Sequence, residues 1–302
     1  MAILKIDPST GVITVKSTLD RETQAQFSLT VVAKDSGTPS LSASTVVMVM
    51  IDDVNDNAPV FSPQIFYGSI REDASPGSTV LKVEAKDKDE GTNGQLQFDL
   101  QGKGRYNFSI DSRGFIHTAT PLDYEKTGSY ILTVTAMDGG SPPGTASAQV
   151  NITIINVDDN VPVFETSSQA SKIREDVAVG TRVVRLNATD ADGNELMFDI
   201  LSGNTGGAFE IHNSSGLIRV AAKLDREKIA TYHLAVRATD RGGHSVTHNA
   251  TILVIDVNDN APMFTQPSYS KDIMENLPSG QLIATVSALD KDKVITLVSA
   301  TR

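Results

Sequence analysis

One nine-residue pattern occurs three times in the chain, at residues 53–61, 156–164 and 256–264. Each copy holds an acidic triplet, Asn-Asp-Asn or Asp-Asp-Asn, followed by proline two residues later and by phenylalanine two residues after that. The prolines stand at positions 59, 162 and 262, so they are 103 and 100 residues apart. A period of about 100 residues is too long for a solenoid repeat and matches a small domain. We therefore interpret the pattern as a linker between copies of one domain.

The segments between the linkers carry the same motifs in the same order. Residues 58–160 and 161–260 each contain the full order, residues 1–57 contain its back half, and residues 261–302 contain its beginning. The sequence thus predicts two complete repeats flanked by two partial ones. A half-repeat leaves strand edges open and a core face uncovered, so we expect the partial repeats to be marginally stable alone.

Alternating apolar residues predict β-strands throughout each repeat. In the first complete repeat, the runs 130–136 and 150–154 place every second residue on one apolar face, and Leu81, Val83 and Ala85 predict a third strand. Short strands separated by turns, without a helical period, are typical of a Greek-key β-sandwich of immunoglobulin-like architecture. The expected fold class is all-β, with tandem sandwich repeats. The absence of Trp and Cys excludes the antibody subtype.

The composition excludes several functional classes. The chain has 302 residues, of which 39% are hydrophobic and 21% charged, as in globular proteins. The net charge of −11 argues against nucleic acid as a partner. The sequence has no apolar run of the roughly 18 residues that span a membrane, and its N-terminus lacks the apolar core of a signal peptide. We therefore expect contact with a membrane only through parts absent from this chain.

Acidic residues recur at the predicted strand ends of every repeat. An Asp-x-Glu motif follows a leucine, an Asp-x-Asp motif begins two residues after an alanine, and a lone Asp follows a later strand. Carboxylates gathered at one end of a sandwich repel each other unless a cation lies between them. Calcium takes six to eight oxygen ligands from carboxylates, amides and backbone carbonyls. Asp-x-Asp alone also occurs in simple turns and in sugar-nucleotide enzymes, so the calcium hypothesis depends on the recurrence of the whole set.

The linkers, the Leu-Asp-Arg-Glu and Leu-Asp-Tyr-Glu motifs and the Asp-x-Asp turns together resemble the extracellular repeats of the cadherin superfamily. The resemblance extends over essentially the whole chain, and is nearest to long non-classical members of Fat, Dachsous or protocadherin type. It implies about three calcium ions at each complete junction, held by the preceding repeat, the linker and the following repeat.

The resemblance also implies a ligand set for each junction. The middle junction would use Glu72, Asp123, Glu125, Val157, Asp158, Asp159, Asn160, Asp190, Asp192, Asn194 and Asp240. The first would use Asp20, Glu22, Val54, Asn55, Asp56, Asn57, Asp87, Asp89, Asn93 and Asp138. The third would use Glu175, Asp225, Glu227, Val257, Asn258, Asp259, Asn260, Asp290 and Asp292.

The middle junction differs from the other two in charge and completeness. Asp158 stands where the family usually has Asn, which adds negative charge and is expected to tighten binding. The eight acidic residues of the middle junction carry a charge of −8, against the +6 that three calcium ions would carry. We expect a junction that hinges without calcium and is stiff with it. For Asp53 and Asp256, the first residues of their linkers, the sequence is equally consistent with structural turn residues and with minor ligands.

Other polar residues receive simpler interpretations. The five histidines share no metal-binding spacing and are expected at the surface. Five Asn-x-Ser/Thr sequons occur, and all are expected to avoid the core, four of them on outward-facing strand positions. This pattern favours a secreted context. The sequons lie at Asn107, Asn151, Asn187, Asn213 and Asn249.

The sequence therefore favours a calcium-dependent cell–cell adhesion module. It would be a calcium-rigidified piece of a longer membrane-anchored ectodomain at the cell surface, with a cadherin-type protein partner that is either homophilic or heterophilic. One alternative is a mechanical spacer without an adhesive surface of its own. A more remote alternative is a carboxylate-based hydrolase, which the recurrence of the acids at boundaries, rather than once in a single cleft, argues against.

Overall fold

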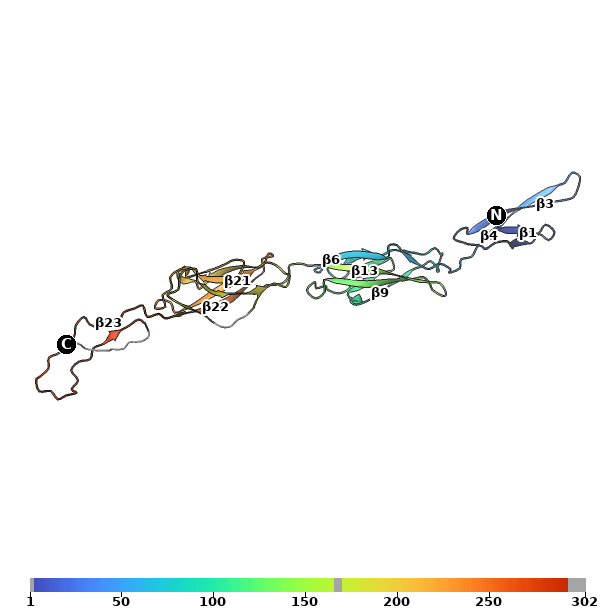
Figure 1. Cartoon of the computed structure of the whole chain (residues 1–302). Helices are drawn as coiled ribbons and strands as arrows, with labels where there is room; N and C mark the ends of the chain where they lie inside the picture. Colours follow the sequence, from blue (N-terminus) through green and yellow to red (C-terminus); the bar gives the residue numbers. More distant parts are fainter. Residues whose placement is uncertain (1–2, 166–169, 293–302) are drawn as a thin grey trace. The chain divides into compact units, whose positions relative to one another are not determined.

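A computed structural model describes residues 3–165 and 170–292 as an almost purely β-structure. The chain divides into two compact units, Met1–Val157 and Asp158–Arg302. Each unit contains one complete sandwich, drawn in green-blue for the first and yellow-orange for the second in Figure 1. The predicted all-β tandem sandwich class is confirmed. The domain limits at residues 57, 160 and 260 stay predictions.

The first unit contains a four-stranded sheet in the order β6-β13-β12-β9 and a three-stranded sheet in the order β10-β11-β7. Strands β12 and β13 form a long antiparallel pair, and β6 joins β13 in parallel. A short pair, β5-β8, completes the sandwich. The elements of the sandwich are β5 (Val60–Phe61), β6 (Ile65–Arg71), β7 (Thr79–Lys82), β8 (Ala85–Lys86), β9 (Gln97–Gln101), η1 (Arg105–Asn107), β10 (Phe108–Ile110), β11 (Phe115–Thr118), β12 (Ser129–Met137) and β13 (Thr145–Ile155).

The second unit repeats this topology. Its sheets have the orders β15-β22-β21-β18 and β16-β20-β19, and β14 pairs with β17. The parallel partner of β22 is β15. The elements of this sandwich are β14 (Val163–Phe164), β15 (Ser171–Arg174), β16 (Arg182–Arg185), β17 (Ala188–Thr189), β18 (Met197–Ser202), η2 (Thr205–Gly207), β19 (Phe209–Ile211), β20 (Leu217–Val220), β21 (Thr231–Thr239) and β22 (Ser245–Ile255).

The core of each sandwich follows the predicted alternation. In β13, Val150, Ile152 and Ile154 are at most 1% exposed, and they pack between the two sheets. Phe61 and Phe164, the last residues of the first two linkers, are buried, whereas Phe264 is 60% exposed. The linker phenylalanine therefore belongs to a core in the two complete repeats and not in the third segment.

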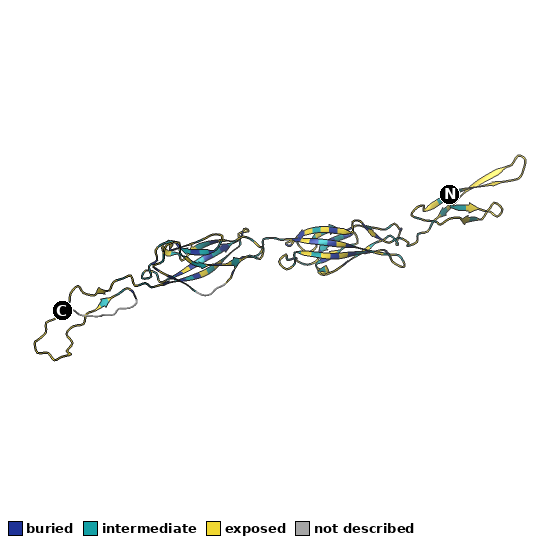
Figure 2. Cartoon of the chain, viewed as in Figure 1, coloured by how far each residue is buried: buried dark blue, intermediate teal, exposed yellow. Residues whose placement is uncertain are grey.

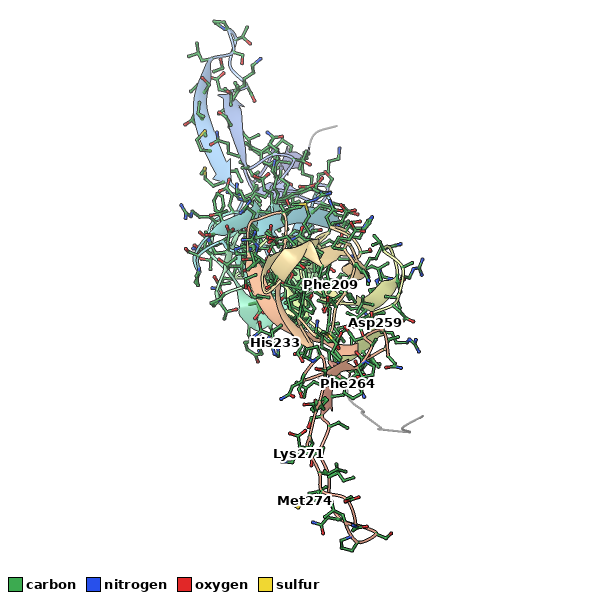
Figure 3. All side chains as sticks on the ribbon, turned by 90° about the vertical axis from the view of Figure 1, so that its left-hand side faces the viewer. Phe209, His233, Asp259, Phe264, Lys271 and Met274 are labelled. Atoms are coloured by element: carbon green, nitrogen blue, oxygen red, sulfur yellow. The ribbon has the colours of Figure 1, made fainter. Side chains whose placement is uncertain are left out.

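The partial repeats form hairpins without a core. Among residues 3–52 and 261–292, no apolar side chain is fully buried, and both segments are coloured mainly as exposed in Figure 2. Figure 3 labels Phe264 and Met274, the second of which is 83% exposed. The strands are β1 (Leu4–Ile6), β2 (Ile13–Val15), β3 (Gln26–Lys34), β4 (Ser42–Met50), β23 (Met263–Phe264) and β24 (Ala288–Leu289).

Two strand expectations need correction. The predicted strand through Leu81, Val83 and Ala85 is two strands, because β7 pairs with β11 in one sheet and β8 pairs with β5 elsewhere. The outward-strand placement of four sequons holds for Asn151 and Asn249, which lie in β13 and β22. It is wrong for Asn107, at the end of η1, and for Asn187, between β16 and β17.

No helix in the described residues is long and apolar enough to cross a membrane.

Candidate metal centres

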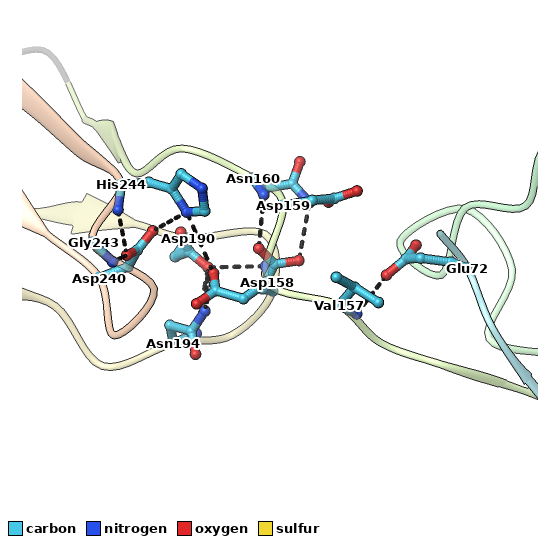
Figure 4. A network of polar contacts seen from close by, with 11 residues as sticks. Glu72, Val157, Asp158, Asp159, Asn160, Asp190, Asn194, Asp240, Gly243 and His244 are labelled. Carbon is cyan, nitrogen blue, oxygen red and sulfur yellow. Dashed lines mark hydrogen bonds and ion pairs between the residues drawn. The ribbon is translucent and has the colours of Figure 1, made fainter. Parts of the chain in front are cut away.

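A buried glutamate follows the first long strand of each complete repeat and fastens the next linker to it. Glu72, which is 5% exposed, accepts hydrogen bonds from the backbone nitrogens of Tyr124 and of Val157, the latter at 2.7 Å (Figure 4). Glu175 accepts two bonds of 2.7 Å from the corresponding backbone nitrogens of the second unit. Because a buried carboxylate needs such partners, each glutamate orders the start of its linker.

The last asparagine of each acidic triplet donates two hydrogen bonds to the second aspartate of the Asp-x-Asp turn that follows it. Its backbone nitrogen and its Nδ2 donate to the two oxygens of one carboxylate, at 2.7–3.1 Å. The same Nδ2 donates to the triplet's own aspartate at 2.8–2.9 Å. These paired hydrogen bonds join Asn57 to Asp89, Asn160 to Asp192, and Asn260 to Asp292. The aspartates of the three triplets are Asp56, Asp159 and Asp259. The spacing therefore brings linker and turn carboxylates together.

The first aspartate of each Asp-x-Asp turn is held by its own turn. The Oδ1 atom of Asp87, Asp190 and Asp290 accepts from the backbone nitrogen two residues on, at 2.9–3.0 Å. This local bond fixes the carboxylate as in an Asx-turn. The Oδ2 atoms of Asp87 and Asp190 are buried, and they accept no hydrogen bond within the described part of the chain.

The lone aspartate after the later strand is buried in both complete repeats. Asp138 is 2% exposed and accepts from the backbone nitrogens of Gly140 and Gly144, each at 2.9 Å, and from Asn55 Nδ2 at 3.3 Å. Asp240 is 3% exposed and is likewise held by two backbone nitrogens of its turn, at 2.7 and 2.8 Å. These turns place the two carboxylates beside their linkers.

Within the second unit, three predicted ligands form one cluster. Asp158, Asp190 and Asp192 each offer a carboxylate oxygen, and these oxygens lie within 4.8 Å of one another. Asn194 donates from Nδ2 to Asp158 Oδ1 at 2.9 Å and approaches Asp190 Oδ1 at 3.4 Å (Figure 4). The middle linker is divided between the two units after Val157, so the residues contributed by the first unit belong to a separate group.

His244 belongs to this site, although the spacing of the histidines predicts only a surface position for it. Its Nδ1 lies 3.1 Å from Asp240 Oδ2 and 3.7 Å from Asp158 Oδ1 (Figure 4). The signal was available in the sequence as a histidine four residues after the lone aspartate. The first complete repeat has Pro142 and Gly144 in the same turn, so no repeated spacing drew attention to the histidine.

The first linker gathers Glu22, Asp53 and Asp89, whose carboxylate oxygens lie within 4.8 Å of one another. Arg21 counters this negative charge, because its guanidinium is 3.6 Å from Asp53 and bonds Glu90 at 2.5 Å. The hydrogen bond to Glu90 raises the pKa of Arg21. The motif Leu-Asp-Arg-Glu thus supplies both an acid and its counter-ion.

Asp53 has the contacts of a structural turn residue. Its Oδ2 accepts from the backbone nitrogen of Glu90 and from Nδ2 of Asn93, each at 3.0 Å. These bonds attach the start of the linker to the Asp-x-Asp turn of the following repeat. Asn93, expected as a ligand, therefore has its side-chain nitrogen engaged by Asp53.

The third linker gathers Glu175, Glu227 and Asp259 in the same way, again within 4.8 Å. Arg226 lies 3.7 Å from Glu227 and 3.6 Å from Asp256, as Arg21 does beside Asp53 in the first linker. Burial, followed by the charge of Glu175, raises the pKa of Glu227. Burial disfavours the charged carboxylate by removing it from water, and the neighbouring Glu175 disfavours it further by like-charge repulsion.

The first acid of each Asp-x-Glu motif is engaged locally instead of in these clusters. Asp123 bonds Lys126 Nζ at 2.6 Å, and Asp225 bonds Lys228 Nζ at 2.8 Å. These side-chain bonds are the main cause of the lowered pKa of both aspartates. Asp20 instead accepts from the backbone and hydroxyl of Thr23, each at 3.0 Å. Each carboxylate keeps lone pairs beyond these hydrogen bonds, so the three acids stay predicted ligands.

Two features of the described residues fit a hard cation. Buried oxygens of four predicted ligands accept no hydrogen bond there, namely Asn55 Oδ1, Asp87 Oδ2, Asp190 Oδ2 and Glu227 Oε1. Two glycines leave room for ligand side chains: a Cβ at Gly140 would lie 2.2 Å from Asn55, and one at Gly242 would lie 2.3 Å from Asp158. The donor set is almost entirely oxygen, as calcium prefers. The whole predicted ligand set stays a prediction, including the carbonyls of Val54, Val157 and Val257, the side chain of Asn258 and the contribution of Glu125.

Comparisons with known proteins agree with this architecture. A family model described as "Cadherin domain" matches residues 1–52, 66–155 and 169–257. The chain is 38% identical over 298 residues to "Cadherin EGF LAG seven-pass G-type receptor 2" of Mus musculus, covering 95% of this chain and 10% of that protein. It is 40% identical over 290 residues to "Protocadherin Fat 4" of Homo sapiens, covering 93% of this chain and 6% of that protein. The chain thus spans about a tenth or less of the length of these relatives.

Solved structures show the same repeat architecture. The extracellular domain of protocadherin GammaB4 matches with a TM-score of 0.77 and 35% identity, over 96% of this chain and 47% of that one. The protocadherin gammaB7 EC3-6 cis-dimer structure matches with a TM-score of 0.79 and 28% identity, over 96% of this chain and 74% of that one. Since the family model matches well over half of the sequence, the chain belongs to the cadherin family.

Proposed function

We propose that the chain is a calcium-binding part of a cell-surface adhesion ectodomain, in which the linkers are the calcium sites. The observation that carries the proposal is the set of buried, unbonded oxygens of Asn55, Asp87 and Asp190 at recurring positions. Neighbouring carboxylates supply the rest of the oxygen donors. Cadherin repeats of adhesion receptors are structural and adhesive modules, so the hydrolase hypothesis is not retained.

The charges of the chain explain what calcium would change. Each nearby pair of carboxylates repels by about 1–4 kcal/mol, depending on the effective dielectric. When bound, calcium supplies divalent positive charge that offsets this repulsion. The chain itself holds the oxygens in place through three kinds of hydrogen bond. These are the bonds that the buried glutamates accept from the linkers, the paired bonds from the linker asparagines to the Asp-x-Asp turns, and the local bonds of the Asx-turns. Without the cation, we expect the linkers to bend.

A calorimetric titration of calcium into the chelator-treated chain tests the sites. We expect saturable binding, and we expect Asp190→Ala to weaken it by at least about tenfold, as loss of a carboxylate ligand should. Asp199→Ala is the matched control, because Asp199 pairs with Arg237 at 3.0 Å in the β18–β21 ladder and is not a predicted ligand. Equal affinities in the two variants would reject the assignment.

The adhesive role needs a separate test, because the chain covers a small share of its relatives. We propose a cadherin-type protein partner, an extracellular position and a longer, membrane-anchored protein. Beads coated with the complete ectodomain should aggregate in calcium. Removal of these repeats should abolish aggregation if they carry an adhesive surface. Replacement by unrelated cadherin repeats of equal length should restore aggregation only if they act as a spacer.

A further inference from the structure

The outer face of the β6-β13-β12-β9 sheet exposes several large apolar side chains, and three of them lie near the middle of β13 on the two strands that flank it, β6 and β12. Tyr67 in β6 is 74% exposed, Ile131 in β12 is 66% exposed, and Ile65 in β6 is 41% exposed. Single exposed apolar residues are ordinary, but a contiguous group on one sheet face points to a covering partner. We call these three residues with Asn151 the Asn151 patch.

Asn151 lies at the centre of this patch. In the register of the sheet, Asn151 of β13 is directly opposite Ile131 of β12 on one side and Tyr67 of β6 on the other. Ile65 is opposite Gln149, two residues earlier in β13. Neighbouring strands are about 4.8 Å apart, so Tyr67 and Ile131 each lie one strand spacing from Asn151, within reach of a group attached to it.

The strand alternation directs Asn151 away from the core. Val150 and Ile152 on either side of it are 0% and 1% exposed, which leaves Asn151 on the outer face. Its side-chain oxygen accepts a bond of 2.7 Å from Gln149 Nε2, which orients the amide. Its Nδ2 makes no hydrogen bond within the described residues. Asn107, by contrast, donates from Nδ2 to the hydroxyl of Tyr130 at 2.7 Å.

Asn151 also begins a sequon, Asn151-Ile152-Thr153. We propose that Asn151 carries an N-linked oligosaccharide whose first sugars cover Tyr67 and Ile131. The inference rests on the extracellular position in the proposed function. The amide Nδ2 attacks the anomeric carbon of an oligosaccharide carried on a lipid pyrophosphate. A C–N bond forms, the C–O bond to the pyrophosphate breaks, the lipid pyrophosphate leaves, and the amide gives up one proton.

The physical gain comes from the two faces of a sugar ring. The C–H face packs on the exposed tyrosine ring and on the isoleucine and removes apolar surface from water, while the hydroxyls stay solvated. The glycan would therefore cover an apolar face that is exposed to water in the unmodified chain. It would act as a cover of the sheet, held by one covalent bond at its centre.

The second unit provides a matched control. Its sequon residue Asn249 lies on the corresponding strand, β22, and is opposite Ala235 of β21, a small side chain. A glycan there has no large apolar partner directly across the ladder. Thr251, at the position that corresponds to Asn151, is opposite His233 instead.

The test uses the 302-residue chain secreted from mammalian cells behind a heterologous leader. Glycopeptide mass spectrometry should find Asn151 modified. Enzymatic removal of the glycans under native conditions should lower the unfolding temperature by about 4 °C and increase the binding of an apolar dye. Both shifts should vanish in Tyr67→Ser/Ile131→Ser, which lacks the apolar partners, and should persist in Asn249→Gln, which lacks only the control glycan.

Three outcomes would overturn the inference. One is an unmodified Asn151 beside a modified Asn213, which lies exposed in a turn. A second is a modified Asn151 whose deglycosylation changes neither the unfolding temperature nor dye binding. A third is the absence of modification at every sequon. Calcium binding, titrated on the same preparation, reports on the proposed function separately, so failure of one proposal does not imply failure of the other.

Discussion

Asp158 occupies the position at which the other two linkers carry Asn55 and Asn258. The additional carboxylate lies among Asp190, Asp192 and Asp240, and it is accompanied by the amide of Asn194 and the imidazole of His244. The second unit thus offers a cation more negative charge at this linker than the asparagine of the other linkers would. The negative charge is a property of single residues, and single substitutions test it.

We expect Asp158→Asn to weaken calcium binding at its linker by roughly tenfold, because one charge is removed from direct reach of the cation. The reciprocal change Asn258→Asp should strengthen binding at the third linker. Terbium luminescence, competed with calcium, measures both affinities. Unchanged affinity in both variants would show that charge at this position does not control binding.

The lowered pKa of Asp111 predicts how the stability of the fold depends on pH. Its carboxylate accepts from the backbone nitrogens of Phe115 and Arg113, each at 2.9 Å, and the bond from Phe115 is the main cause of its lowered pKa. A carboxyl whose pKa is lower in the folded state stabilises the fold above its unfolded pKa of about 3.9, and this contribution is lost as the pH falls through the folded value.

Asp111→Asn should therefore be less stable than the parent chain at pH 7, and the two should converge as the pH falls through the lowered pKa of Asp111. Urea unfolding at a series of pH values measures the difference. A difference that stays constant across this range would mean that the side chain acts by packing and not by its charge.

At the scale of elements, β13 separates core from surface by alternation. Ile152 is 1% exposed, whereas Ile155, at the end of the strand, is 45% exposed. Ile152→Ala should lower the free energy of unfolding by about 2–5 kcal/mol, since it removes buried methyl groups and leaves a cavity. Ile155→Ala is the control and should change it by less than about 0.5 kcal/mol. Equal effects in chemical denaturation would contradict the register of β13.

The bonds of Glu72 predict a cost that does not depend on calcium. Glu72→Ala leaves the backbone nitrogens of Tyr124 and Val157 without their acceptor. An unsatisfied buried donor costs about 1–3 kcal/mol, and these part-buried donors should cost less, so the variant should still unfold earlier in urea even in chelator. Destabilisation seen only in the presence of calcium would assign Glu72 to the cation alone.

Alternation in the sequence was sufficient to predict the long strands, because β12 and β13 each keep one face buried over their whole length. It was insufficient for Leu81–Ala85, where Val83 is 1% exposed between β7 and β8. The chain changes its pairing partner there while the alternation continues. Hydrophobic patterns report which face is buried, not which strand lies alongside, so the parallel pairing of β6 with β13 was equally hidden.

Recurrence explains what could be predicted of the metal centres. The motif positions indicated which acids gather, and the clusters at Asp89, Asp192 and Glu227 agree with that expectation. The positions of Arg21 and Arg226 as counter-ions were not evident, because arginine within Leu-Asp-Arg-Glu has no assigned partner in a linear sequence. His244 was missed since it occurs in one repeat, and its contact with Asp240 depends on a turn conformation.

At the scale of the whole molecule, the chain combines two complete sandwiches with partial repeats that have no buried apolar side chain among their described residues. The complete repeats contain their own cores, whereas the three linkers combine a high density of acids with restricting prolines. The linkers are therefore where a cation can most change the behaviour of the chain without changing its folds.

Small-angle X-ray scattering of the chain, with calcium and with chelator, tests this account most directly. Bound calcium should offset the repulsion at the linkers, so we predict a larger maximum dimension and a narrower distribution of shapes in calcium, reversed on chelation. The Asp190→Ala variant should show a smaller response. Superimposable scattering curves in the two conditions, at a calcium concentration that saturates the calorimetric titration, would contradict the claim that the linkers are calcium-stiffened.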